Sequence, residues 1–172
     1  MQILNTARTT IHAITEADAD FFIALVNSPG WQQYINNPKV YNRDDALRYL
    51  NEGFLKSYTD HSFSYYLVRN LAGDAIGIGG FLKKAYLPAV DFGFALLPQY
   101  YNQGFALEFS RAILHFGVKT FGFDELIAVT SIENLRSQRL LEKLDFKYQE
   151  VFTVESIPEP LKLFRRLRVD TN

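Results

Sequence analysis

The chain is 172 residues long, 48% hydrophobic and 15% aromatic, and carries a formal net charge of −1. This length and apolar content predict a folded domain with a core of its own and exclude a disordered chain. The near-neutral charge gives no overall attraction to nucleic acid or to an anionic membrane. Cysteine is absent, which excludes disulfides, thiolate metal sites and cysteine nucleophiles.

Two further observations bear on location and partners. Residues 1–10 hold polar and charged groups rather than the apolar run of a secretory signal, and no stretch approaches the roughly 20 apolar residues of a membrane span. We therefore expect a cytoplasmic protein, a single domain over residues 1–172, with neither nucleic acid nor a membrane as partner. Arg165, Arg166 and Arg168 form the one candidate basic patch, which we interpret as charge protecting an edge strand.

Strands and helices alternate along the chain. Thr15 and Asp18 form a capping-box pattern before an apolar helical stretch, and Asn42 with Asp45 repeats it. In chain order we expect strands at residues 8–14, 64–68, 75–81, 90–97, 126–129, 146–154 and 161–168, the last two joined by a loop around Pro158 and Pro160, and helices at 31–35, 104–120 and 133–144. This order predicts a mixed α/β (α+β) domain rather than a doubly wound one.

The polar turn between the strand at 90–97 and the helix at 104–120 is the most informative feature of the sequence. Gly104 has no Cβ, so a ligand can approach the backbone closely there. The first N–H groups of a helix have no intrahelical partner and attract anions. We therefore expect the N–H groups of residues 102–106 to hold a pyrophosphate-bearing cofactor. Glu108, in the first helical turn, is expected to serve the helix dipole.

Other candidate sites are weaker. The glycine-rich run at 73–80 lacks a following helix and a Lys-Ser/Thr pair, so it favours a closely packed hairpin over a nucleotide loop. His12, His61 and His115 lack the spacing of metal ligands, and we expect no metal site.

Two segments resemble the GNAT family of N-acetyltransferases. Residues 91–98 followed by 101–106 are similar to the acetyl-CoA signature of that family. Asn134, Ser137 and residues 142–146 are similar to the downstream pattern of its RimJ/RimL-like branch.

The resemblance covers nearly the whole chain, since residues 8–12 also resemble the usual start of that branch. Two positions depart from the pattern. Tyr101 stands where the family usually has Arg or Gln, although an aromatic residue is common there in the RimL-like branch. Asp145 stands where glycine is usual, and Asp tolerates the left-handed geometry of a helix-ending turn.

The resemblance implies a GNAT-type fold: a central, mostly antiparallel twisted sheet of about six to seven strands flanked by helices and splayed between the fourth and fifth strands. It also implies acetyl-CoA as cofactor, its pantetheine arm hydrogen-bonded along residues 94–96 beside a splayed neighbour at 127–130. The implied cofactor-binding residues are Phe94, Ala95, Leu96, Leu97, Tyr101, Asn102, Gln103, Gly104, Phe105, Ala106, Asn134, Ser137 and Lys143. For Asn134, a purely local role at the helix start stays open.

The implied reaction is the attack of an amine on a thioester, for which an ammonium group must first lose a proton. Asp91 takes the place of a catalytic glutamate of the family and is expected to act as base through a water; a solvated strand-edge carboxylate is the alternative. Ser137 either protonates the departing thiolate or only hydrogen-bonds the helix or the cofactor. The backbone N–H of Leu96 or Leu97 is the expected oxyanion donor.

The acceptor is expected to be a primary amine. Trp31, Tyr34 and Tyr41 lie in the region that forms the acceptor lid of the family, and are our candidates for substrate binding, with core packing as the alternative for each. The branch implies a protein N-terminal amine. A small amine (polyamine, amino acid or antibiotic) stays open as acceptor, as do a catalytically silent CoA-binding module and a homodimer.

Overall fold

The computed structural model describes residues 1–168, so residues 169–172 of the expected single domain lie outside the described residues. Its centre is an eight-stranded sheet in the order β1-β2-β3-β4-β5-β6-β8-β7. The strands are β1 (Gln2–Asn5), β2 (Thr9–Ala13), β3 (Tyr65–Asn70), β4 (Ala75–Leu82), β5 (Val90–Leu96), β6 (Glu125–Ser131), β7 (Lys147–Val154) and β8 (Ile157–Leu167).

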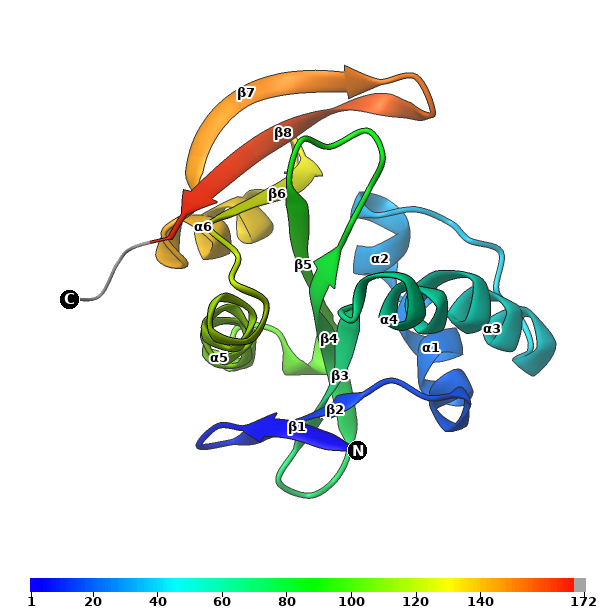
Figure 1. Ribbon diagram of the computed structural model, residues 1–172. Coiled ribbons are helices and arrows are strands. Elements are labelled where there is room, and N and C mark those ends of the chain that lie inside the picture. The colour runs from blue at the N-terminus through cyan, green and yellow to red at the C-terminus, as the bar shows by residue number, and fades with distance from the viewer. Residues whose placement is uncertain (169–172) are drawn as a thin grey trace.

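Helices cover both faces of this sheet, and the β7–β8 hairpin arches over one end of it (Figure 1). The helices are α1 (Ala19–Val26), α2 (Pro29–Tyr34), α3 (Arg43–Leu50), α4 (Lys56–His61), α5 (Phe105–Phe121) and α6 (Leu135–Lys143). α1 to α4 lie on one face, where Phe22 and Leu50 pack against Ile78 of β4. α5 and α6 lie on the other face, where Phe109 and Leu141 pack against Phe92 of β5. None of the helices within residues 1–168 is both long and apolar enough to cross a bilayer.

The expected fold is confirmed, with the splay where it was expected. All neighbouring strands are antiparallel except β5 and β6, which pair at only two positions, Val90 with Leu126 and Asp91 with Ile127. The strand count differs from the expected six to seven because β1, a four-residue strand, adds an edge beside β2. So short a segment carries little alternation to reveal it.

Two expectations for the C-terminal hairpin are wrong. Pro158 and Pro160 lie within β8 rather than in a loop. Ile157 pairs with Val154 of β7, the register then shifts before Leu161 pairs with Phe152, and the ladder with β6 begins only at Leu161. A proline is tolerated where no ladder partner needs its missing N–H. Arg165 and its neighbours do not protect an edge, since β8 has a partner on each side and β7 is the edge strand.

Local signals in the sequence set the helix positions that matter for the site. The side chain of Asn42 accepts a hydrogen bond from the Asp45 N–H at 2.9 Å, which confirms the cap that opens α3. α5 can lie close to the sheet because Gly79 of β4 has no side chain; a Cβ there would be 2.9 Å from the Phe109 ring. This close packing fixes the start of α5 beside the end of β5.

Candidate active site

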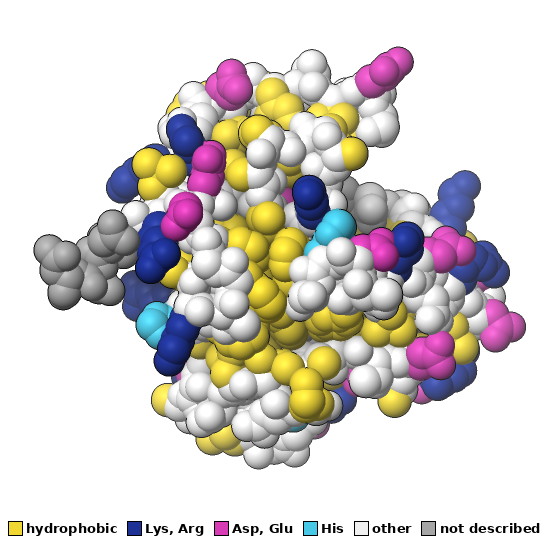
Figure 2. Space-filling view, viewed as in Figure 1, with side chains coloured by type: hydrophobic (Ala, Val, Ile, Leu, Met, Phe, Trp, Pro, Cys, Tyr) yellow, Lys and Arg dark blue, Asp and Glu magenta, His cyan; other side chains and the backbone are white. Residues whose placement is uncertain are grey.

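A single hollow of about 530 Å³ brings together the end of β5, the start of α5, one face of α6 along its length, and α2. On the face shown in Figure 2, hydrophobic side chains gather in a central hollow below the β7–β8 hairpin. The described lining residues are Ser28, Gly30, Trp31, Tyr34, Ile35, Phe94, Ala95, Leu96, Tyr100, Tyr101, Asn102, Gly104, Phe105, Ala106, Leu107, Asn134, Arg136, Ser137, Arg139, Leu140 and Lys143. Most of the residues expected to hold the cofactor thus line the same pocket.

The open end of β5 presents its backbone to this pocket. The N–H of Leu97 donates to the carbonyl of Ile76 on β4 at 2.9 Å, so it is not free to serve as an oxyanion donor. Because N–H directions alternate along a strand, the N–H groups of Phe94 and Leu96 point away from β4, toward the side where the ladder with β6 has ended. Of the two expected donors, Leu96 is therefore the one that fits.

The turn before α5 has the shape of an anion seat. Gly104 is the N-cap of α5 at φ 80°, and Asn102 also has a left-handed backbone at φ 58°. Residues other than glycine adopt that conformation at a cost in free energy. Glycine at position 104 is therefore favoured by its backbone conformation as well as by the space that it leaves for a ligand. Asn102, Gly104, Phe105 and Ala106 all line the pocket, while Gln103 is not among the described lining residues. The orphan N–H groups at the start of α5 therefore lie at the pocket wall.

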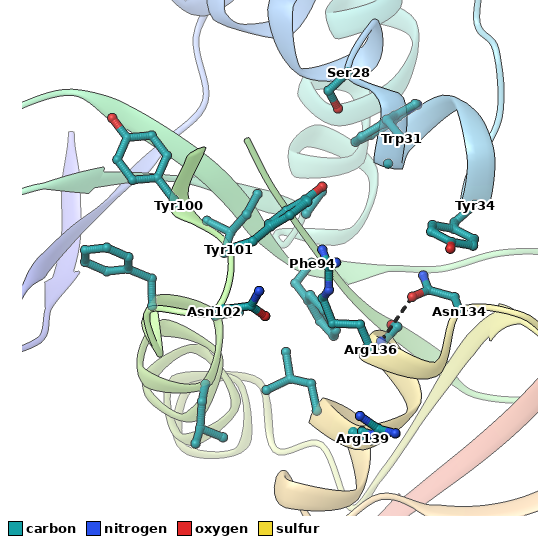
Figure 3. A pocket seen from close by; sticks show the side chains of 18 of the residues that line it. Ser28, Trp31, Tyr34, Phe94, Tyr100, Tyr101, Asn102, Asn134, Arg136 and Arg139 are labelled. Carbon is teal, nitrogen blue, oxygen red and sulfur yellow. Dashed lines mark hydrogen bonds between the residues drawn. The ribbon is translucent and has the colours of Figure 1, made fainter. Parts of the chain in front are cut away.

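The opposite wall is the start of α6. The side-chain oxygen of Asn134 accepts a hydrogen bond from the Ser137 N–H at 3.1 Å (Figure 3). Asn134 therefore does cap the helix locally, and since its amide nitrogen is directed the other way it remains available to a ligand. Asn134 and Ser137 both line the pocket.

Sequence reasoning missed two cations of α6 that line the pocket, Arg136 and Arg139. Arg136, Arg139 and Lys143 all line the pocket, and only Lys143 was expected to. The signal was present: positions separated by three and four residues share a helix face. Together they make this wall positively charged, whereas none of the described lining residues is an aspartate or glutamate.

An aromatic bridge crosses the pocket between α2 and α6. The guanidinium carbon of Arg136 lies 4.3 Å from the centre of the Tyr101 ring, within the range of a cation–π contact. On the other side, a Cβ built on Gly30 of α2 would overlap the Tyr101 hydroxyl. Burial raises the pKa of Tyr101, and Arg136 acts against that rise. In Figure 3 the Tyr101 side chain separates Trp31 from Arg136.

Asp91 lies at the closed end of β5, buried with 2% of its surface exposed. Its Oδ2 is 2.7 Å from the Nζ of Lys84, so the alternative of a solvated carboxylate is wrong. Its Oδ1 is buried without a hydrogen-bond partner among the described residues. Burial raises the pKa of Asp91, and the charge of Lys84 opposes this rise. Burial acts to lower the pKa of Lys84, but the attraction of Asp91 is stronger, so the pKa of Lys84 is raised. Asp91 is not among the described lining residues of the pocket.

The aromatic residues expected to bind substrate are divided. Trp31, 4% exposed, and the half-buried Tyr34 line the pocket. Tyr41 is 65% exposed and does not line it. Among residues 1–168 no group of three or more His, Cys, Asp or Glu side chains could hold a metal ion, and no metal was expected.

Comparison with known proteins agrees with this geometry. Residues 8–147 match the family model described as Acetyltransferase (GNAT) domain. The chain belongs to the GNAT acetyltransferase family. It is an N-acetyltransferase of a family that uses acetyl-CoA, and the family resemblance drawn from the sequence is confirmed.

The relatives differ in what they act on. An uncharacterized N-acetyltransferase of Bacillus subtilis, YoaA, is 25% identical over 152 residues, which cover 87% of this chain and 85% of that protein. The solved structure of the ribosomal L7/L12 α-N-protein acetyltransferase RimL with coenzyme A has a TM-score of 0.82 at 14% identity, covering 97% of this chain and 98% of that one. Spermidine N-acetyltransferase from Vibrio cholerae, solved with CoA and spermine, has a TM-score of 0.76 at 18% identity, covering 92% and 95%. These structures show the shared fold and leave the acceptor of this chain undetermined.

Proposed function

We propose that this GNAT protein binds acetyl-CoA in the pocket between β5, α5 and α6 and transfers its acetyl group to a primary amine. The observation that carries the proposal is the start of α5: a left-handed Gly104 without a side chain places the first N–H groups of a 17-residue helix at the pocket wall. Such a helix start attracts a diphosphate through both its unpaired N–H groups and its dipole.

The residues of the pocket fit coenzyme A. The anion seat at residues 102–106 would hold the diphosphate, and Arg136, Arg139 and Lys143 supply positive charge for phosphate oxygens on the facing wall. The backbone of Phe94 and Leu96 would hydrogen-bond the pantetheine arm as an added strand, with the Asn134 amide donating from α6. Tyr101 and Leu140 would give the arm apolar contacts.

Bound acetyl-CoA supplies a thioester, whose carbonyl carbon an amine can attack. For the proton of the amine we assign Asp91, acting through a water relay because its side chain does not reach the pocket lining. Its raised pKa makes it a stronger base near neutral pH than an exposed carboxylate. The Leu96 N–H is directed to stabilise charge on the carbonyl oxygen. The Ser137 hydroxyl at the pocket wall is our candidate donor of the proton to the leaving thiolate.

Among amines, we propose a protein N-terminal α-amine rather than a polyamine. A polyamine carries several positive charges, which a site binds with carboxylates, and the described pocket lining contains cations and no carboxylate. Trp31 and Tyr34 of α2, with Ile35 directly after it, offer an apolar wall for the first side chains of a peptide.

Titration calorimetry with coenzyme A tests the cofactor, with pantetheine, which lacks the diphosphate, as the matched ligand. We expect heat from coenzyme A and much weaker binding of pantetheine.

Thiol release from acetyl-CoA with a panel of N-terminal peptides, amino acids and spermidine then tests the acceptor, and we expect the peptides to react fastest. No heat from coenzyme A on folded protein would overturn the cofactor assignment. Binding without turnover would indicate a silent module, and spermidine reacting fastest would overturn the acceptor.

A further inference from the structure

Glu108, in the first turn of α5, is held by the turn between β1 and β2. Its Oε2 accepts from Arg8 Nε at 2.6 Å, and its Oε1 accepts from the Arg8 backbone N–H at 2.8 Å and from the Thr6 hydroxyl at 2.6 Å. Burial acts to raise the pKa of Glu108, but the hydrogen bonds from Thr6 and Arg8 outweigh it and lower that pKa. The carboxylate therefore stays charged at neutral pH and does more than serve the helix dipole.

The same arginine also holds the backbone of the polar turn. Arg8 Nη1 donates to the carbonyl of Gln103 at 2.9 Å, and its guanidinium carbon lies 4.6 Å from the centre of the Phe105 ring. Arg8 Nη2 lies 3.3 Å from the point where a Cβ of Gly104 would be. Arg8 thus contacts the residues on both sides of Gly104, from the side of the turn that faces away from the pocket.

This contact determines where the Gly104 N–H points. In a planar trans peptide the carbonyl and the following N–H are directed oppositely, so a Gln103 carbonyl held by Arg8 turns the Gly104 N–H away from Arg8. Gly104 lines the pocket, and Arg8 is not among its described lining residues. The N–H is therefore directed from the Arg8 side toward the pocket side of the turn.

We propose that Arg8 is a positioning residue for the anion seat: anchored by Glu108, it fixes the Gln103–Gly104 peptide with its N–H directed at the cofactor diphosphate. The inference rests on the proposed binding of coenzyme A in this pocket. The left-handed backbone at Asn102 has to be held by its surroundings, and Arg8 supplies a contact to the carbonyl of the next residue, Gln103.

The variant Arg8→Gln tests the proposal through binding and kinetics. We expect its Kd for coenzyme A by calorimetry, and its KM for acetyl-CoA, to rise about tenfold, which is about 1.4 kcal/mol. Its kcat and its KM for acetyl-pantetheine, which has no diphosphate, should stay unchanged. Arg43→Gln is the matched control, because Arg43 also forms a half-exposed ion pair, at 3.1 Å with Asp20, away from the pocket. It should bind coenzyme A as the wild type does.

Glu108→Gln separates positioning from charge, and it also decides the matter if Arg8→Gln does not fold. Removing a negative charge near the diphosphate would by itself tighten binding, whereas releasing Arg8 should weaken it. Weaker coenzyme A binding in Glu108→Gln supports the proposal. Equal or tighter binding overturns it, as does a KM for acetyl-pantetheine that rises as much as that for acetyl-CoA. A wild type that fails to bind coenzyme A would overturn the proposed function instead.

Discussion

The two ends of β5 lie in opposite surroundings. At Val90 and Asp91 the strand pairs with β6, and Lys84 neutralises a buried carboxylate. From Phe94 to Leu96 the ladder with β6 has ended, and the backbone faces a pocket. The closed end holds β6 in the sheet, and the open end leaves hydrogen-bonding groups for a ligand. We therefore expect changes at the closed end to alter stability and kcat, and changes around the open end to alter cofactor binding.

The largest effect on stability should come from Lys84→Met at the closed end. It leaves the Asp91 carboxylate buried without its counter-ion, at a cost of about 3 kcal/mol of unfolding free energy at neutral pH. Urea unfolding measures this loss. The matched control is Lys56→Met, which breaks an exposed pair with Asp60 and should cost much less stability.

The cost of Lys84→Met should also depend on pH in a defined direction. The pKa of Asp91 is raised in the folded chain, so on acidification the folded state takes up a proton before the unfolded state does. The variant should therefore recover stability as pH falls from neutral toward the ordinary carboxyl pKa. A loss that stays constant over that range would contradict a charged, buried Asp91.

Gly104→Asp should abolish cofactor binding at the open end. The new Cβ would lie 3.3 Å from Arg8 Nη2, so the aspartate carboxylate would compete with the Gln103 carbonyl for Arg8 and would add negative charge beside the anion seat, which repels phosphate. With coenzyme A at about 100 times the wild-type Kd, the variant should lose the roughly 2.7 kcal/mol of stabilisation that thermal unfolding detects in the wild type. Gly73→Asp is the control, because Gly73 has a similar φ of 91° and a Cβ there would have no other group within 4 Å. This variant should keep the stabilisation by coenzyme A. Undiminished binding in Gly104→Asp would refute the seat.

Asp91→Asn should lower kcat at neutral pH by about tenfold or more, which is about 1.4 kcal/mol of activation free energy, and should raise the KM for acetyl-CoA less. Steady-state kinetics on folded protein measures both. Asp20→Asn removes an exposed carboxylate and should leave them unchanged. If Asp91→Asn turns over at the wild-type rate, Asp91 is not the base.

The smallest effect should follow from Asn134→Ala. Losing the cap of α6 costs about 1 kcal/mol of unfolding free energy, and losing the amide donor should also weaken coenzyme A binding. Asn42→Ala removes the equivalent cap of α3 and should cost similar stability without any change in cofactor affinity. If the two variants bind coenzyme A equally well, Asn134 is a helix cap only.

The features that sequence reasoning located are local ones. The caps at Asn42 and Asn134 and the glycine turn before α5 depend on residues within one turn of helix, so spacing alone reveals them. The Lys84–Asp91 pair was missed because two strands must first pair before the lysine reaches the carboxylate. Tyr41 was grouped with Trp31 because both are aromatic and near in sequence. Only the folded chain buries Trp31 at the pocket and leaves Tyr41 in solvent.

The errors at the C-terminus have the same origin. The arginines at 165–168 were assigned to a sheet edge, but the strand order places β7 outside β8. Arg165 instead forms an ion pair with Glu125 of the neighbouring β6 at 2.7 Å. No pattern within β8 specifies which of two hairpin strands is inserted in the sheet.

The hydrogen bond from the Arg8 N–H to Glu108 spans 100 positions of the chain. Contacts between such distant segments require a large loop to close and are characteristic of slow steps in folding. During synthesis, residues 6–8 cannot form their hydrogen bonds to Glu108 until α5 has been made. Coenzyme A affinity should therefore arise only after α5 has packed against the turn between β1 and β2, so that a chain whose secondary structure has formed without this contact still lacks a competent cofactor seat.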